Sequence, residues 1–420
     1  MPRTVHIIGA GLSGLSAAVR LVREGWQVHV HEATKSAGGR CRSYFDSAVG
    51  LNIDNGNHLV LSGNRHAVAY ARAIGTEAGL VGPERAQFHF IDLASGKSWL
   101  LDLGNSRFPF WLFDSTRRVP DTSIGDYLAL SPLVWAGTDK AIGDTIICKG
   151  ALYDRLIQPL LLAALNVDPP LGSAGLAGAI VRETLMAGGQ ACRPLIARDG
   201  LSAVLVEPAI DLLRDKGATV NFTHELHRLE MSGDRTTALD FGGDKIALGE
   251  SDAVVLAVPA RPAAGLVPDL SSPNKFRPIV NAHFRYEPPK DMPPMMGVVG
   301  GLIEWLFAFS DRLSVTISDA ERLVNVPREE LARSIWRDIC KAAGISNEIA
   351  EGPLPPWQIV RERRATFEAT PEQHAMRPGP VTSWKNLFLA GDWTDTGLPA
   401  TIEGSIRSGD RAADLVLKMP

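Results

Sequence analysis

The first 40 residues constrain the fold of this chain more than any other segment. Residues 5–8, VHII, predict a short β-strand, and the sequence GAGLSG then places Gly9, Gly11 and Gly14 at the GxGxxG spacing. A helical pattern, LSAAVRLVREG, follows directly. In such a unit the glycines permit a tight turn, a close backbone approach to a pyrophosphate and helix–strand packing, and the phosphate charge meets the helix N-terminus. The segment predicts a Rossmann-like domain that binds a dinucleotide.

Glu32 adds a second feature of a dinucleotide site. A predicted strand, WQVHVHE, follows Gly25 and ends in Glu32, eighteen residues beyond Gly14. At this distance from the glycine turn, a carboxylate can accept hydrogen bonds from the ribose of an adenosine. The first 32 residues therefore predict sites for both the pyrophosphate and the adenosine.

Two more elements, one near each end of the chain, bear on which dinucleotide is bound. The sequence GGRCRS places Gly38 and Gly39, which allow backbone amides near a pyrophosphate, before the guanidinium of Arg40. A domain that binds only NAD does not need this element. Near the C-terminus, NLFLAGDWTDTGLPATIEGSIRSG predicts a strand ending at Gly391 and Asp392, a loop and a helix. A plain strand, turn and surface helix would not explain phosphate-type elements at both ends.

These elements resemble the superfamily of FAD-dependent amine oxidases, phytoene desaturases and protoporphyrinogen oxidases. The resemblance implies an α/β fold, with a Rossmann-like FAD-binding domain of the GR2 type and an inserted mixed α+β substrate domain. It implies that Asp392 binds the ribityl and phosphate region, that the helix from about Thr401 directs its N-terminal amides at the flavin O2, and that a backbone amide near Leu226 meets the adenine. Noncovalent FAD is expected because the C-terminal flavin segment has no cysteine, while attachment through His58 stays open. The FAD-binding residues expected from motif and resemblance together are Gly9, Gly11, Ser13, Gly14, Glu32, Gly38, Gly39, Arg40, Gly56, Asn57, His58, Leu226, Gly391, Asp392, Thr401, Ile402 and Glu403.

The chain is expected to alternate between two domains. The FAD-binding domain comprises residues 1–65, 195–265 and 384–420, and the substrate domain comprises 66–194 and 266–383. The first insertion is mainly helical in pattern, with NRHAVAYARAIG and LYDRLIQPLLLAALN as its clearest helices. The second mixes strands such as RPIVNAHFRYE and RLSVTIS with the helix PREELARSIWRDICKAAG.

Composition excludes several other classes of function. A formal net charge of −4 without a run of like charges argues against a nucleic-acid partner. The four cysteines are scattered without a CxxC, so neither a zinc site nor a disulfide framework is expected. No export signal precedes the first strand, and the longest apolar run, LIQPLLLAAL, is about half of the roughly 20 residues that a membrane span needs. We expect a cytoplasmic protein without a metal, with peripheral contact to the inner face of the cytoplasmic membrane.

The insertions indicate the class of substrate. The segment GVVGGLIEWLFAFSDRLSVTIS has no lysine, and the chain has five tyrosines with none after Tyr286, which weakens an amine-oxidase interpretation. The pieces IDNGNHLVL, LIQPLLLAALNVDPP, GLSAVLVEPAIDLLRDKGATV, EWLFAFSDRLSVTIS and AGDWTDTGLPATIEGSIRSG resemble the squalene-associated FAD-dependent desaturases, the hydroxysqualene dehydroxylases of bacterial hopanoid synthesis. The resemblance implies reductive removal of the hydroxyl of hydroxysqualene, a C30 isoprenoid, with an electron donor that the sequence does not identify.

Such a reaction needs a proton donor, shielding from water and stabilisation of transient positive charge. His58 is the first candidate for the donor because imidazole titrates near neutrality, although a structural histidine that bonds the flavin or backbone is an equal alternative. Asp395 is a further donor candidate. Asn57 stands where the family pattern DNGQH has glutamine, so its amide has a shorter reach. The residues expected to meet the substrate are Trp305, Phe307 and Trp393, with the two indoles offering π faces to an allylic cation and core packing as the alternative for each of the three.

Two other functions stay open at this point. An FAD-dependent desaturase of a polyprenoid such as a carotenoid precursor would share the cofactor domain and the apolar pocket. A noncatalytic protein that binds FAD or lipid would share them too, but would need no aligned proton donor beside an open cavity.

Overall fold

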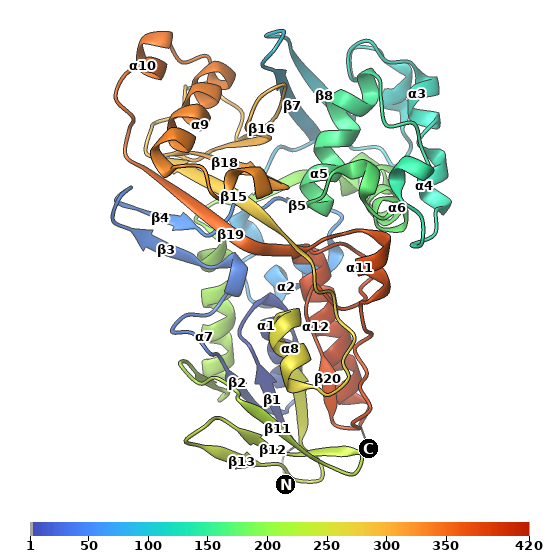
Figure 1. Cartoon of the computed structure of the whole chain (residues 1–420), viewed down its shortest axis with the longest axis vertical. Helices are drawn as coiled ribbons and strands as arrows, with labels where there is room; N and C mark the ends of the chain where they lie inside the picture. The colour runs from blue at the N-terminus through green and yellow to red at the C-terminus, as the bar shows by residue number, and fades with distance from the viewer. Residues whose placement is uncertain (1–2, 420) are drawn as a thin grey trace.

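The structure, a computed structural model, describes residues 3–419 and has two parts, one above the other in Figure 1. The lower part contains a five-stranded sheet, and both ends of the described chain lie at its base. The upper part contains a seven-stranded sheet with helices on its two sides. This is the mixed α/β architecture that the sequence predicts.

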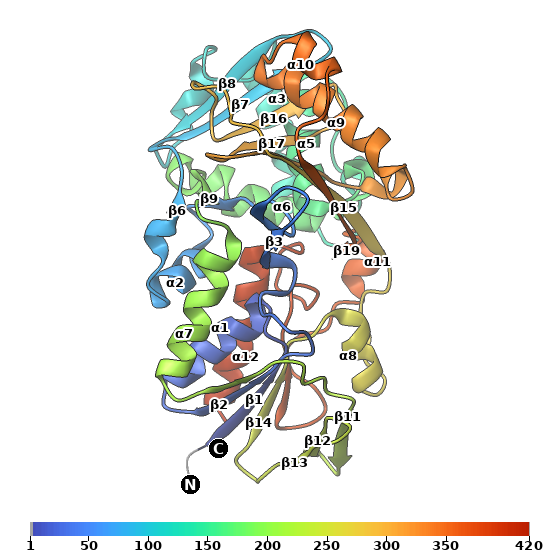
Figure 2. The ribbon, with the colours of Figure 1, turned by 90° about the vertical axis from the view of Figure 1, so that its left-hand side faces the viewer.

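The lower sheet is entirely parallel. Its strands, in spatial order, are β10 (Thr219–Asn221), β2 (Gln27–His31), β1 (Thr4–Ile8), β14 (Ala253–Leu256) and β20 (Leu387–Leu389). Valine, isoleucine and leucine dominate the central strands because both faces are covered. Figure 2 shows α1 (Leu12–Arg23), α7 (Glu207–Asp215) and α12 (Ile402–Leu417) on one side of this sheet. On the other side lie α8 (Ala260–Leu266) and a meander of β11 (Arg228–Ser232), β12 (Arg235–Asp240) and β13 (Lys245–Ala247).

The first and last long helices pack against each other very closely. A Cβ built on Gly409 of α12 would lie only 2.1 Å from the carbonyl oxygen of Ser13 in α1. The hydroxyl of Ser16 also donates to Asp410 at 2.6 Å, and Arg20 pairs with Asp414. The glycine lets the two backbones approach, so the C-terminal helix is an integral part of the N-terminal domain.

The upper sheet is mixed, with parallel pairing between β16 and β7 and antiparallel pairing elsewhere. Trp336 of α9 (Arg328–Ala343) is fully buried against one face, with its ring 5.2 Å from that of Phe284. The other face packs on the helical segment that contains α3 (Ile124–Leu128), α4 (Ser131–Trp135), α5 (Gln158–Leu165) and α6 (Ala174–Glu183). The strands in spatial order are β19 (Trp357–Phe367), β15 (Phe276–Phe284), β18 (Leu313–Ile317), β17 (Trp305–Ala308), β16 (Met295–Val299), β7 (Ala86–Asp92) and β8 (Ser98–Gly104).

Smaller elements connect the two parts. β3 (Ser43–Asp46) pairs with β4 (Leu51–Asp54), and β9 (Pro194–Ala197) pairs with both β5 (Val60–Leu61) and β6 (Leu80–Val81). The remaining α-helices are α2 (Arg65–Ala73), α10 (Asn347–Glu351) and α11 (Pro371–Ala375).

The segment 66–194 differs from the sequence prediction in two respects. It is not only helical, because it also contains β7 and β8, which are strands of the upper sheet. Its first helix, α2, buries Ala67, Tyr70 and Ala71 in the same hydrophobic cluster as α1 and α12, so it packs with the lower part. The predicted helix LYDRLIQPLLLAALN is present but starts with a wider π-helical turn at 153–157, because Pro159 cannot donate a backbone hydrogen bond.

Candidate active site and FAD cradle

The glycine turn after β1 forms a cradle open to a ligand. Gly9 has φ +104°, and a Cβ at this residue would lie 2.6 Å from the carbonyl oxygen of Ala257. A Cβ on Gly14 would lie 2.0 Å from the carbonyl oxygen of Gly9, so α1 begins in direct contact with the turn. A Cβ on Gly11, by contrast, would meet nothing within 4 Å. The packing of the chain itself does not require a glycine at position 11. A glycine here is explained by the close approach of a pyrophosphate to the backbone.

The GGR turn lies directly beside this cradle. The Gly38 amide donates to the carbonyl oxygen of Ala10 at 2.8 Å, and Gly38 forms a β-bridge with Gly11. Gly38 and Gly39 both have positive φ, +99° and +56°, which explains why two glycines occur here. Two backbone segments rich in N–H groups thus border one open space, as a phosphate site requires.

Glu32 lies at the end of β2 with its carboxylate fixed by backbone amides. Oε2 accepts from the Ala10 amide at 2.8 Å, and Oε1 accepts from the amide and hydroxyl of Thr34 at 2.9 and 2.8 Å. Oε2 keeps one free acceptor site, because a carboxylate oxygen can accept two hydrogen bonds. The carboxylate is therefore oriented and still able to accept a ribose hydroxyl.

Arg40 and Asp392 connect the two ends of the chain at this site. Arg40 Nη2 lies 2.7 Å from Asp392 Oδ1, and the guanidinium also donates to the carbonyl oxygen of Ala365 in β19. Arg377 holds the loop that begins at Asp392. It is buried and donates to the carbonyl oxygens of Asp392 and Trp393 at 3.1 and 3.4 Å. Burial lowers the pKa of Arg377 to about 10, so it stays charged near neutrality. The sequence analysis did not predict Arg377 because it belongs to no motif and binds mainly backbone carbonyl oxygens.

The N-terminus of α12 presents free amides. Thr401 is the N-cap, and its hydroxyl accepts from the Gly404 amide at 3.0 Å. The amides of Ile402 and Glu403 make no hydrogen bond within residues 3–419. Unpaired amides at a helix N-terminus attract the partial negative charge of a carbonyl such as the flavin O2.

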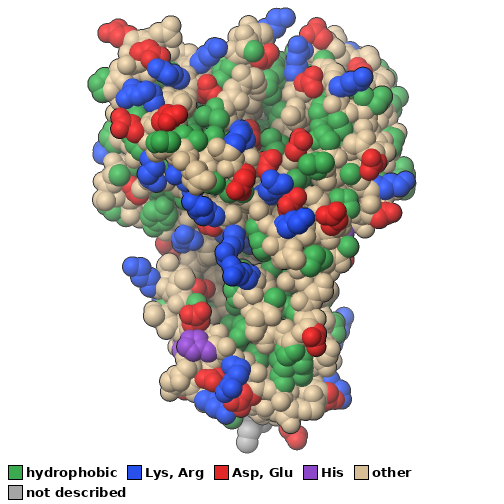
Figure 3. Space-filling view, viewed as in Figure 1, with side chains coloured by type: hydrophobic (Ala, Val, Ile, Leu, Met, Phe, Trp, Pro, Cys, Tyr) green, Lys and Arg blue, Asp and Glu red, His purple; other side chains and the backbone are tan. Residues whose placement is uncertain are grey.

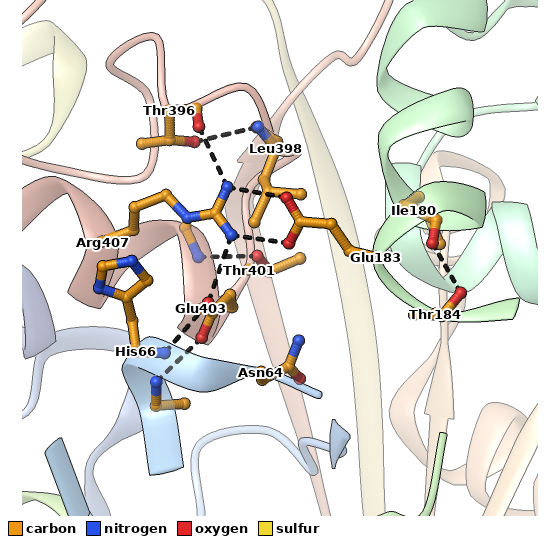
Figure 4. A network of polar contacts seen from close by, with 12 residues as sticks. Asn64, His66, Ile180, Glu183, Thr184, Thr396, Leu398, Thr401, Glu403 and Arg407 are labelled. Carbon is orange, nitrogen blue, oxygen red and sulfur yellow. Dashed lines mark hydrogen bonds and ion pairs between the residues drawn. The ribbon is translucent and has the colours of Figure 1, made fainter. Parts of the chain in front are cut away.

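The side chain of Glu403 has a structural task, shown in Figure 4. Its buried carboxylate accepts from the amides of His66 and Ala67 at 3.2 and 2.9 Å and thereby caps α2. Arg407 lies 3.3 Å from Glu403 and 2.6 Å from Glu183 at the end of α6. Only the backbone of Glu403 is thus available to a flavin. The network joins α12, α2 and the helical segment of the upper part.

The stretch IDNGNH runs from β4 to the underside of the upper sheet. A Cβ on Gly56 would lie 3.0 Å from Nδ2 of Asn281, so this backbone passes close to β15. Asn57 Nδ2 donates to the carbonyl oxygen of Val315 and the hydroxyl of Thr316 at 3.2 and 3.3 Å. Asn57 Oδ1 is buried without a partner, as expected of an acceptor that faces a site for a ligand.

The two candidate proton donors, His58 and Asp395, lie in different environments. Burial and the charge of Arg40 lower the pKa of His58 to about 4, so its imidazole is neutral near pH 7. Asp395 is exposed, and its Oδ1 accepts from the Gly397 amide at 3.1 Å in a surface turn. The exposure of Asp395 and the lowered pKa of His58 disfavour these two residues as the proton donor, and their donor roles stay predictions.

The three residues predicted to meet the substrate lie in one apolar cluster. Trp305 and Phe307 are buried on the face of β17 opposite α9, beside residues of α5 and α6, and Trp393 is buried in the same cluster. Trp393 Nε1 donates to the carbonyl oxygen of Val258 at 2.8 Å, which fixes the orientation of its indole. Trp305 Nε1 is buried without a partner. Leu226 is also buried in this cluster, next to the start of the meander.

Residues 3–419 also show neither a metal site nor a membrane-spanning helix. No group of three or more histidine, cysteine or carboxylate side chains is arranged to hold a metal ion, and the four cysteines are free thiols. Within the same residues, no helix combines the length and the apolar character that a bilayer span requires.

The chain matches known proteins over its full length. Residues 12–417 match the family described as flavin containing amine oxidoreductase. A hydroxysqualene dehydroxylase from Rhodopseudomonas palustris is 69% identical over 418 residues and one from Sinorhizobium fredii is 66% identical over 417, each covering 99% of both chains. A 15-cis-phytoene desaturase from Glycine max is only 21% identical, over 99% of this chain and 80% of the relative.

Solved structures agree with the fold. Cyclohexylamine oxidase from Brevibacterium oxydans superposes with a TM-score of 0.68 at 19% identity and covers 99% of each chain. The cradle described above fits FAD, since it combines open glycine positions, an oriented carboxylate and free helix amides. The chain is an FAD-dependent oxidoreductase of the flavin containing amine oxidoreductase family, and within that family it belongs to the hydroxysqualene dehydroxylases.

Proposed function

We propose that this enzyme converts hydroxysqualene to squalene by reductive removal of the hydroxyl group, as a step of squalene and hopanoid synthesis. The observation that carries the proposal is the 69% identity, over the full chain, to a protein named hydroxysqualene dehydroxylase. The buried apolar cluster with Trp305 and Phe307 supports a hydrocarbon substrate. In this proposal residues 1–65, 195–265 and 384–420 form the FAD-binding domain, on which α2 also packs, and the other residues of 66–194 and 266–383 form the substrate-binding domain.

The reaction is balanced by one proton and one hydride. The allylic C–O bond breaks as the oxygen takes a proton and leaves as water, and the resulting delocalised cation is quenched by hydride. Reduced FAD, when bound, supplies that hydride. The protein contributes apolar walls that keep water from capturing the cation, while buried aromatic faces stabilise its charge.

His58 orients the leaving hydroxyl in this proposal. A neutral imidazole is a poor acid but still donates one N–H hydrogen bond. Asn57 holds the preceding backbone against β18 through Val315 and Thr316. The rate with His58→Gln, which keeps a donor, should fall less than with His58→Ala, and equal losses would contradict an orienting role.

The location and the electron source belong to the proposal as well. The proposed location is the cytoplasm, at the inner face of the cytoplasmic membrane, because a C30 isoprenoid substrate resides in lipid. An electron donor must reduce the flavin after each turnover, since every product consumes two electrons.

Anaerobic single turnover tests this function. Photoreduced enzyme is mixed with hydroxysqualene, flavin absorbance near 450 nm is followed, and the organic extract is separated by gas chromatography. We expect flavin reoxidation together with an equal amount of squalene. Reduced flavin that stays unchanged would refute the proposal.

The same experiment separates the two alternatives. A carotenoid-type desaturase would reduce its oxidised flavin with phytoene and release desaturated products. A noncatalytic binding protein would change neither flavin nor lipid. The 21% identity to a phytoene desaturase gives the first alternative only distant support.

A further inference from the structure

Large apolar side chains on the surface are concentrated in the helical segment of the upper part. Eight of the eleven exposed large hydrophobic residues in the described chain lie between positions 108 and 186. Scattered exposed apolar residues are ordinary, but a concentration of this size on one segment indicates a contact surface. Six of them, exposed by 56 to 84%, form what we name the aromatic patch: Phe108, Phe110, Phe113, Leu128, Trp135 and Met186.

Local packing brings the first four together. The rings of Phe108 and Phe110 are 6.0 Å apart, and Phe113 ends the same short helical turn. Trp111 in this turn points inward and meets the ring of Tyr127 edge-on at 5.3 Å. The turn therefore lies on α3, which carries Leu128 at its end.

Contacts of α6 add the other two. Arg182 donates to the carbonyl oxygen of Val134 at 2.5 Å, so the end of α6 lies beside Trp135, and Met186 follows in the next turn. The Gly189 amide donates to the carbonyl oxygen of Ser106 at 2.9 Å. The segment after Met186 therefore lies beside the segment that leads to Phe108. Figure 3 shows hydrophobic side chains on the upper right of this face, over α3 and α4, with charged groups of both signs between them.

The helices that carry the patch also face the apolar cluster of the site. Leu133 of α4 and Leu176 of α6 are buried in the cluster that contains Trp305 and Phe307. α4 thus combines an exposed apolar side chain, Trp135, with a buried one, Leu133. α6 is buried along residues 174–181 and leads directly to Met186. This continuity links the patch to the place where a hydrocarbon is expected to react.

Charges of both signs border the patch. Arg107 and Arg182 are exposed and form no ion pair within residues 3–419. The exposed Asp114 and Asp126 accept hydrogen bonds from Thr116 and Ser123 in their own turns. Two arginines can meet lipid phosphates, but no strongly basic field is present, so apolar insertion must dominate any membrane affinity.

We propose that the aromatic patch inserts into the surface of a phospholipid bilayer. Phenylalanine, leucine and tryptophan are the side chains that bury at the boundary between headgroups and acyl chains. The inference rests on the proposed function, because a C30 substrate resides in lipid and reaches a docked enzyme without crossing water. A second copy of the chain or a protein partner on this surface would be the competing occupants.

Vesicle flotation tests the docking surface. The holoenzyme is mixed with phosphatidylcholine vesicles, with and without phosphatidylglycerol, and the floated fraction is compared with that of Phe108→Ser/Phe110→Ser/Phe113→Ser. The control, Phe45→Ser/Ile349→Ser/Val381→Ser, removes exposed hydrophobic residues outside the patch. We expect the patch variant to lose about tenfold or more in vesicle affinity, the control to bind as the wild type does, and the anionic lipid to change little.

Docking would be overturned by a wild type that does not float with vesicles, or by a patch variant that floats as well as the wild type. It would also be overturned if the wild type were a dimer that binds no vesicles and the patch substitutions converted it to a monomer. Turnover of detergent-dispersed substrate keeps this question separate from the reaction. We expect the patch variant to match the wild type in detergent and to fall behind it when vesicles supply the substrate. A wild type that fails in detergent would count against the proposed function, and flotation would still decide the docking.

Discussion

At the scale of single residues, two glycines of one motif should respond differently to the same substitution. Gly14→Ala places a Cβ 2.0 Å from the Gly9 carbonyl, so it should destabilise even the FAD-free protein, by about 1–3 kcal/mol or more. Gly11→Ala meets no protein atom within 4 Å and should leave FAD-free stability unchanged while weakening FAD binding. Thermal unfolding without FAD and fluorescence titration with FAD measure the two effects. Equal unfolding temperatures for both variants would contradict this assignment.

The site residues also show what sequence spacing can predict. Gly9, Gly14 and Glu32 lie where the motif requires them, because their roles depend on neighbours close in sequence or in the same unit. The ionisation of His58 and the exposure of Asp395 were not predictable. Both depend on how segments from the rest of the chain bury or expose them.

At the scale of elements, Glu403 should matter for stability and not for the cofactor. Glu403→Gln removes the charge that caps α2 and pairs with Arg407, so the free energy of unfolding should fall by about 1–3 kcal/mol. FAD binding should persist because the backbone amide at this position is unchanged. Urea unfolding and the flavin absorption spectrum measure the two properties.

Glu183→Gln is the matched control for that variant. It weakens the same Arg407 network but leaves the cap of α2 in place, so it should cost less stability. A Glu403→Gln enzyme that is as stable as the wild type would show that the cap is not important.

The elements missed from the sequence have a common physical cause. β7 and β8 were assigned to a helical insertion, yet β7 pairs with β16, about 200 positions further along the chain. The short strand β10 completes the parallel sheet by pairing with β2, about 190 positions earlier in the chain. In both cases a distant partner, not the local pattern, selects the strand.

At the scale of the whole molecule, stability should depend on pH through buried histidines. Burial, reinforced by neighbouring histidines, lowers the pKa of His6 to about 4 and that of His31 to about 3, with the two rings hydrogen bonded at 3.1 Å. The unfolded chain, with a pKa near 6.5, therefore binds more protons below that pH. This contribution to stability is complete above about pH 6.5 and falls as the pH decreases toward 4.

Urea unfolding at pH 7, 6 and 5 measures this dependence. Each fully shifted histidine contributes a slope of up to about 1.4 kcal/mol per pH unit. His31→Gln should flatten the plot of unfolding free energy against pH. Burial raises the pKa of Glu304 to about 7, which gives a pH dependence of opposite sign in both proteins. Subtracting the two plots removes this shared contribution. Parallel profiles would refute the role of His31.

The ion pair between Arg40 and Asp392 joins residues 352 positions apart, and α12 completes the packing of α1. Translation therefore makes the glycine turn long before it makes these partners. Until residues 387–417 have been synthesised, α1 lacks the helix that covers it and Arg40 lacks its carboxylate partner. The dinucleotide-binding unit is thus completed by a segment that is distant in sequence.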